Sequence, residues 1–189
     1  MHRYLLSVFA FSCLLLYSLT ACGYRVGNSG LTSKYSSISV PYVQGDVDGS
    51  LTAAITHQIA RSGSFTYRAD GGELLLIVKI VDLSDENVGF RYNRNKEGDL
   101  KKTIIPVETR LFITVEVVVT EAASGCVVLE PVRLFASMVC DHDYYSSANE
   151  VNRFSLGQLS DVDAAFEAVQ RPLNEELALK IVDYISDSW

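Results

Sequence analysis

The sequence around Cys22 is typical of a lipidation site and not of a catalytic cysteine. Cys22 follows Leu19-Thr20-Ala21, and leucine, two small residues and cysteine are typical of the site at which bacterial lipoprotein precursors are cut and acylated. Arg3 and the apolar run from Leu5 to Leu19 resemble a signal peptide, because the run is shorter than the ~20 residues of a membrane span. We therefore predict removal of residues 1–21 and a stable anchor of two or more acyl chains on Cys22. The alternative is an ordinary secretory signal with a chance cysteine, or an uncleaved anchor.

A second group of residues could bind phosphate. The segment between two predicted strands is rich in basic residues, namely Arg91, Arg94, Lys96, Lys101 and Lys102. Only Glu97 and Asp99 oppose them, and two aromatic residues, Phe90 and Tyr92, lie among them. Guanidinium groups bind phosphate bidentately, so the segment predicts a contact with a phosphorylated lipid or with an acidic partner surface. The alternative is a solvated loop whose charges only keep it soluble.

Catalytic patterns are not evident in the sequence. The mature chain would keep only His57 and His142, and we find no G-x-S-x-G and no Gly-rich phosphate loop after a strand. Asp141-His142-Asp143 could hold a metal ion or act as an acid–base group, but successive side chains of a strand point to opposite faces. We therefore predict a solvated strand end there, no enzymatic activity, and no metal or cofactor.

Composition limits the classes of partner. The 189 residues suffice for one domain with a substantial core. Their formal net charge of −7 argues against general nucleic-acid binding.

The two cysteines beyond Cys22 are predicted to stay unpaired. Cys126 and Cys140 lie in one predicted strand, in which their separation would be about 46 Å at ~3.3 Å per residue. A disulfide requires Cα atoms within ~7 Å of each other, so no bond is expected unless the strand folds back.

The domain is expected to begin after a short tether. Residues 22–37 are rich in Gly and Ser and show no apolar period, which predicts a flexible lipidated tether before a single domain over residues 38–189. Alternation from Ile38 to Tyr42 predicts a first strand, and Pro41 places it at or near a sheet edge.

A helix should follow this strand. Asp46 or Asp48 can cap it, and it would run to about Arg61. Its apolar face at a spacing of 3.6 comprises Leu51, Ile55, Ile59 and Ser62, with His57 on the opposite, solvated face.

Three strands are predicted in the middle of the chain. Residues 73–83 are apolar at both even and odd positions, and residues 105–121 alternate strictly between apolar and polar. Residues 127–139 follow a turn at Ser124-Gly125. In the last strand the apolar residues change from odd to even positions at Pro131, which predicts a bulge. Residues 84–103 are predicted to form a loop or an extended hairpin tip.

The last element is a long helix that begins near Ser160, where Asp163 completes a capping box. Pro172 should kink it or split it in two. Its buried stripe would comprise Val162, Phe166, Val169, Leu173, Leu177, Ile181 and Ile185. The order of elements predicts an α+β two-layer sandwich, a four-stranded mixed sheet with two helices on one face.

The strand over residues 73–83 then has one face that the helices do not cover. An uncovered apolar face implies a partner. The alternative is that the polar loops fold over it.

Five segments of the chain resemble, in their order, a known family. They are Cys22-Gly23-Tyr24-Arg25-Val26, Ile38-Ser39-Val40-Pro41-Tyr42, Gly49-Ser50-Leu51-Thr52 at the start of a helix, the apolar strand after Gly72-Glu73, and the hairpin around Ser124-Gly125. Together they resemble the lipopolysaccharide-assembly lipoprotein (LptE-like) family, over essentially the whole chain.

This resemblance implies a non-enzymatic part of the outer-membrane translocon that inserts lipopolysaccharide into the outer leaflet. In that family the lipoprotein plugs a large β-barrel partner, aids the barrel's folding and can bind lipopolysaccharide through basic residues. Gly23 is not Asp, and by resemblance to the lipoprotein-sorting rule of enteric bacteria it points to the outer membrane, on its periplasmic side. The contact candidates by location and charge are Arg91, Arg94, Lys96, Lys101 and Lys102.

Two other functions remain open from the sequence. An auxiliary lipoprotein of an ABC-type lipid-transport system looks like the same kind of small α+β domain behind a lipid anchor. A lipid-anchored hydrolase comes third, because no nucleophile–base pair is evident.

Overall fold

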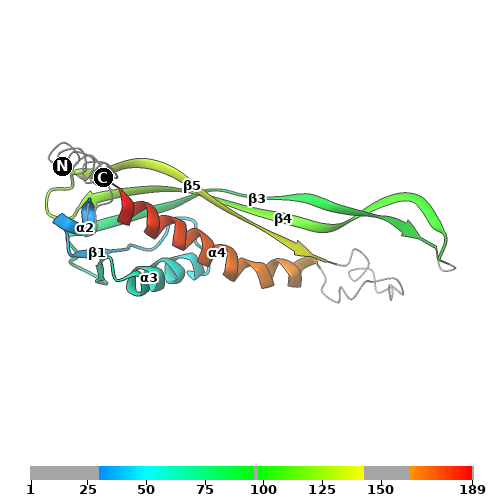
Figure 1. Cartoon of the computed structure of the whole chain (residues 1–189), viewed down its shortest axis with the longest axis horizontal. Coiled ribbons are helices and arrows are strands. Elements are labelled where there is room, and N and C mark those ends of the chain that lie inside the picture. The colour runs from blue at the N-terminus through cyan, green and yellow to red at the C-terminus, as the bar shows by residue number, and fades with distance from the viewer. Residues whose placement is uncertain (1–29, 96–97, 143–161, 189) are drawn as a thin grey trace, which may run out of the picture.

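The structure is a computed structural model that describes residues 30–95, 98–142 and 162–188. In chain order its elements are α2 (Leu31–Lys34), β1 (Ser37–Ser39), α3 (Ser50–Ser62), β2 (Thr66–Tyr67), β3 (Leu74–Arg94), β4 (Leu100–Glu121), β5 (Val127–Asp141) and α4 (Val162–Asp187). The strands form one sheet in the order β2-β1-β3-β4-β5, with α3 and α4 on the same side of it (Figure 1). This confirms the α+β fold. The sheet has five strands rather than four because β2, only two residues long, pairs with β1.

The core lies between the helices and one face of the central strands. On β3, Leu74, Leu76 and Val78 are buried, and each is paired with a residue of β4 across an antiparallel ladder. The alternation predicted for β4 is confirmed, because its odd-numbered residues from Ile113 to Val119 are also buried. The apolar period of 2 therefore sets which face of the sheet the helices cover.

Beyond the core the sheet narrows to two strands. The ladder between β4 and β5 ends where Glu108 pairs with Asp141, but β3 and β4 stay paired as far as Arg94 and Leu100. We call the outer part of this hairpin, residues 90–107, the arm; it extends beyond both helices (Figure 1). The hairpin alternative for residues 84–103 is thus confirmed, and the loop alternative is wrong.

The arm ends in a turn held by side chains as well as backbone. Asn95 N–H donates to the Asp99 carbonyl oxygen at 2.9 Å, and Asp99 N–H donates to Asn95 Oδ1 at 2.7 Å. Gly98 has a φ of 95°, which favours glycine at this position.

The hairpin between β4 and β5 matches its prediction. Gly125 has a φ of 69°, and its N–H donates to the Glu121 carbonyl oxygen at 2.8 Å. The register shifts between the Val117–Val132 and Val119–Leu129 pairs, so the bulge predicted at Pro131 is confirmed. Cys126 and Cys140 are both free thiols, as expected.

The folded domain begins earlier than residue 38. Leu31 of α2 and Tyr35 are buried in the core, and the Tyr35 hydroxyl donates to Glu121 Oε1 at 3.1 Å. A tether over all of residues 22–37 is therefore wrong for its last part, because two large apolar side chains hold that part to the sheet. The position at or near a sheet edge expected from Pro41 is confirmed, because β1 lies next to the edge strand β2. The strand itself ends at Ser39, before Pro41.

Helix α3 begins where a buried carboxylate satisfies its free N–H groups. Asp46 accepts the N–H of Leu51 at 3.4 Å, and at its other oxygen the N–H and the hydroxyl of Thr52 at 2.8 and 2.6 Å. The predicted cap is thus confirmed, although Gly49 occupies the N-cap position itself. Leu51, Ile55 and Ile59 are buried as predicted, and His57 is exposed.

Helix α4 is one element from Val162 to Asp187 with Pro172 inside it. The predicted split is therefore wrong. Proline removes the bond to the carbonyl of residue 168, but Ala168 is exposed, so water can satisfy that carbonyl. The buried residues of the second half include Leu173, Leu177, Ile181 and Ile185, as predicted. The Ser160 cap lies outside the described residues.

Candidate functional site

The basic residues predicted to bind phosphate lie on the arm. Arg91 and Arg94 belong to β3, and Lys101 and Lys102 belong to β4, so the hairpin brings both groups to one end of the molecule. Lys96 lies outside the described residues, as does the predicted lipidation site Cys22.

These basic side chains do not share one face of the arm. Arg91 pairs with Ile105 and Tyr92 pairs with Ile104, and paired residues of an antiparallel ladder point to the same face. Because successive residues of β3 alternate, Arg94 lies on the face of Tyr92 and Arg91 on the other. Lys101 and Lys102 lie opposite them in β4, where the register shifts between the Tyr92–Ile104 and Arg94–Leu100 pairs. Arg94 Nη1 also donates to the Gly98 carbonyl oxygen at 2.7 Å, which holds this guanidinium beside the turn.

The arm also carries exposed apolar side chains beside the basic ones. Phe90 is 58% exposed, Tyr92 59%, Leu100 62% and Ile104 56%. We call these four residues the apolar stripe; by register and alternation they lie on the face of Arg94, and Lys102 is exposed nearby in β4. Leu100 and Ile104 were missed in the sequence, because their parity is opposite to that of the alternating apolar residues in 105–121. This face can contact apolar groups and anions together.

A second exposed surface is the face of the sheet opposite the helices, which we call the outer face. Phe135 of β5 is 61% exposed and pairs with Thr114, while Ile77 and its partner Val118 are half-buried. Charged residues interrupt these apolar groups, because Lys79, Glu116 and Arg133 form one row across β3, β4 and β5. Among the described residues no helix lies on this face (Figure 1).

A buried polar cluster lies where β5 ends. His142 is only 3% exposed, and its Nε2 is 2.9 Å from Thr109 Oγ1, which is itself 2.9 Å from Asn87 Oδ1. Among the described residues, His142 Nδ1 is buried and has no hydrogen-bond partner. The solvated strand end predicted here is therefore wrong for His142, although Asp141 is exposed. Asp143 lies outside the described residues.

A buried thiol lies beside this cluster. Burial raises the pKa of the nearby Cys140 thiol, which disfavours the reactive thiolate, and this thiol donates to the Thr109 carbonyl oxygen at 3.4 Å. Within the described ranges no group of three His, Cys, Asp or Glu residues could hold a metal ion.

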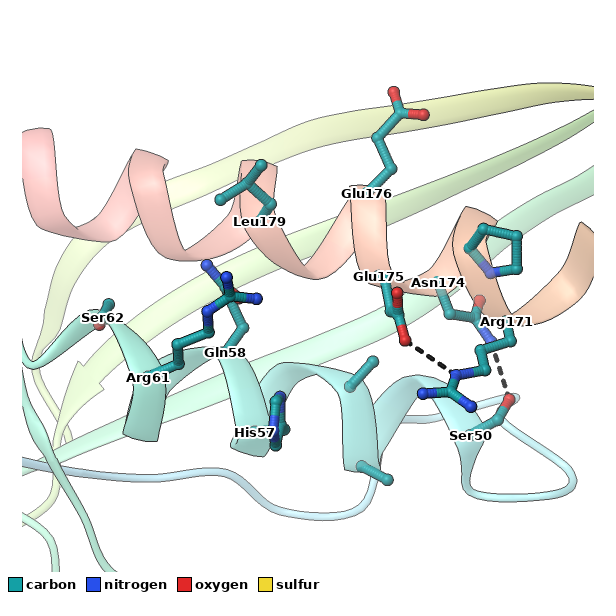
Figure 2. A pocket seen from close by; sticks show the side chains of 13 residues that line it. Ser50, His57, Gln58, Arg61, Ser62, Arg171, Asn174, Glu175, Glu176 and Leu179 are labelled. Carbon is teal, nitrogen blue, oxygen red and sulfur yellow. Dashed lines mark hydrogen bonds and ion pairs between the residues drawn. The ribbon is translucent and has the colours of Figure 1, made fainter.

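A wide groove separates α3 from α4, with a volume of about 1160 Å³ (Figure 2). Asn174 Nδ2 donates to Ser50 Oγ at 2.8 Å at one end of it, which ties the two helices together. Arg171 forms an ion pair with Glu175 at 2.9 Å, but both side chains are well exposed and the pair is screened by water. The groove is therefore solvated and mixed in charge, with His57 on its α3 side.

In the part of the chain that the structure describes, no helix is long and apolar enough to cross a membrane.

No protein-family model and no curated protein matches the chain. Among solved structures, a proposed lipoprotein from Caulobacter crescentus is similar with a TM-score of 0.52 and 18% identity over 85% of this chain and 96% of that one. A minor lipoprotein from Acinetobacter baumannii gives a TM-score of 0.49 and 16% identity, over 80% and 91% of the two chains. Rare lipoprotein B from Shewanella oneidensis gives 0.43 and 13%, over 79% and 93%. The chain thus shares its fold with the Caulobacter protein, and its structural neighbours include bacterial lipoproteins.

Proposed function

We propose that this chain is an outer-membrane lipoprotein of the lipopolysaccharide translocon, anchored by acylated Cys22 on the periplasmic side. It would plug a β-barrel partner and assist the barrel's assembly, and it would bind lipopolysaccharide with the arm. It would have no enzymatic activity. The resemblance of the sequence supports the translocon role, and the lipoprotein neighbours agree with the anchor.

One observation carries the proposal, namely that the sheet offers an elongated surface which the helices do not cover. The outer face and the arm are continuous, because β3 and β4 run through both. Large apolar side chains are exposed along this surface, among them Phe90, Tyr92 and Phe135, and exposed apolar side chains of this size are typical of a surface that is buried in a complex. A plug needs such a surface, whereas an isolated soluble domain does not.

Co-purification discriminates this function from the alternatives. The acylated protein, extracted in mild detergent and isolated by a C-terminal tag, should bring down a β-barrel protein identified by mass spectrometry. An ATPase with inner-membrane subunits in its place would favour an auxiliary lipoprotein of an ABC-type lipid-transport system. A hydrolase would instead be detected by screening ester substrates.

The anchor can be tested by itself. Cys22→Ala should leave a precursor of unchanged size and abolish palmitate labelling, because the thiol that accepts the diacylglyceryl group is gone. Gel mobility and labelling in cells check this, with Cys126→Ala as the matched control, since Cys126 is an exposed thiol elsewhere. Normal labelling of Cys22→Ala would refute the anchor.

The arm should bind lipopolysaccharide through its basic residues. Arg94→Glu combined with Lys102→Glu should weaken binding by about tenfold or more, because two attractive contacts become repulsive. Thermal stability should change little, since exposed charges contribute only ~0–1 kcal/mol to folding. Binding should also weaken as salt rises.

A matched control is available on the helices. Arg61→Glu with Arg171→Glu makes the same change in net charge in the groove between α3 and α4. This pair should leave lipopolysaccharide binding unchanged. Equal loss in both double variants would mean that net charge, and not the arm, sets the affinity.

A further inference from the structure

A second cavity, independent of the proposed function, lies at the base of the arm. It has a volume of about 660 Å³ and is bounded by β3, β4, the start of α3 and the first half of α4. Its floor is apolar and includes Ile80, Leu83, Leu111, Ile113, Phe166 and Leu173. Leu83 is 68% exposed, so this floor is not filled by the described residues. We call this cavity the acidic groove.

The rim of the acidic groove is strongly negative. Four exposed carboxylates stand on it, from Asp48, Asp85, Asp163 and Glu167. None of the described residues that line it is Lys, Arg or His. The Ser50 hydroxyl and N–H, at 2.8 and 3.1 Å from Asp48 Oδ1, hold the pKa of Asp48 below its ordinary value, so this carboxylate stays ionised at neutral pH. The chemistry that fits is an apolar group flanked by cations.

That chemistry is present on the chain itself. The apolar stripe of the arm is 56–62% exposed, Arg94 lies on the same face, and Lys102 is exposed in the facing strand. The apolar stripe could pack against the apolar floor of the acidic groove, and the basic side chains of the arm are opposite in charge to its rim.

The arm cannot reach the acidic groove of its own molecule. Asp85 on the rim and Tyr92 in the stripe lie seven residues apart in one strand, or about 23 Å at ~3.3 Å per residue. The antiparallel ladder with β4 keeps this stretch extended (Figure 1). The two complementary surfaces can therefore meet only between molecules.

The geometry points to self-association of this protein, in which the arm of one copy inserts its apolar stripe into the acidic groove of a second. The contact joins two different surfaces, so it forms an open chain unless the second copy returns the same contact or a ring closes. Charge complementarity favours a second copy as the occupant, because the basic residues of the arm are opposite in sign to the acidic rim. The net charge of −7 opposes contacts between copies that lack this pairing.

Reversing the charges on each of the two surfaces by substitution tests this contact. The mature protein in detergent is compared with a groove variant, Asp85→Lys/Glu167→Lys, and an arm variant, Arg94→Glu/Lys102→Glu, by sedimentation velocity over a range of concentrations. The wild type should associate, and each variant alone should lose about tenfold or more in association constant. An equal mixture of the two variants should recover association, because reversed groove and reversed arm are again opposite in charge.

Cross-linking locates the contact. In a Cys126→Ser background, Glu167→Cys and Tyr92→Cys proteins are mixed with a short bismaleimide; Cys140 is buried and Cys22 is acylated on the proposed anchor. A covalent dimer should form between the two proteins and not within either one alone. Only the arm variant is expected to weaken lipopolysaccharide binding, so failure of self-association is distinguishable from failure of the proposed function.

Three outcomes would overturn the inference. The wild type could remain monomeric at all concentrations. The mixture could fail to recover association, which would place the contact elsewhere. A maleimide could fail to label Glu167→Cys, which would show that another segment of the chain occupies the acidic groove.

Discussion

Leu76→Asp should unfold the domain. Leu76 is fully buried between the sheet and the helices, where its neighbours are apolar. An unpaired carboxylate in such a site costs several kcal/mol, on the order of 3–5, beyond the loss of the packed leucine. Total stabilities of single domains are about 5–15 kcal/mol. Loss of the cooperative thermal transition and of near-ultraviolet circular dichroism would measure this result.

Ile77→Asp, one residue further on, is the matched comparison. Ile77 points to the outer face and is only half-buried beside Val118, so water can solvate the new carboxylate. The variant should fold with a modest loss of stability but co-purify less of the barrel partner, because the outer face is buried in the proposed complex. Unfolding of both variants to the same extent would mean that the outer face is covered within the monomer.

Local patterns were sufficient for most of the fold. Strict alternation in β4 predicts which of its residues are buried, because a period of 2 allows only one assignment of faces. Leu51, Ile55 and Ile59 of α3 were found in the same way from a period of 3.6. The parity change at Pro131 was likewise enough to predict a bulge.

Features that depend on tertiary partners were not predictable in this way. Strand β2 has only two residues, and it exists because β1 offers an edge beside it. The polar half of β3 lacks an apolar period, because its residues 81–87 are exposed on both faces. His142 was placed in solvent because a lone histidine in a polar segment carries no local signal of burial.

For the candidate site, the sequence predicted which residues are basic but not how they divide. Alternation along β3 puts Arg94 and Arg91 on opposite faces, and this could not be predicted while residues 84–103 were open between a loop and a hairpin. The acidic groove was not predictable either. Asp85 of β3 and Glu167 of α4 are far apart in the chain, and packing of the helix on the sheet brings them to one rim.

One glycine beside the apolar strand has a steric reason that the sequence does not show. Gly72 precedes β3 and lies beside Ser39 of β1, because its N–H donates to Ser39 Oγ at 2.9 Å. A Cβ built on Gly72 would lie 2.6 Å from the Ser39 backbone nitrogen and 2.7 Å from the Ile38 carbonyl carbon. Both are main-chain atoms, which cannot rotate away as a side chain can. Parallel pairing of β1 with β3 therefore requires glycine here.

Gly72→Ala should accordingly lower the free energy of unfolding by about 3 kcal/mol, the upper part of the range for overpacking. The matched control is Gly71→Ala, where a Cβ would meet open space but φ is +71°, so only the cost of a left-handed alanine, about 1 kcal/mol, is expected. Urea titration measures both changes. Hydrogen exchange should show the loss of protection in Gly72→Ala concentrated in β1, because the added methyl group pushes that strand away from β3. Equal destabilisation by the two substitutions would mean that β1 shifts freely to accommodate the methyl group and that its pairing contributes little to the core.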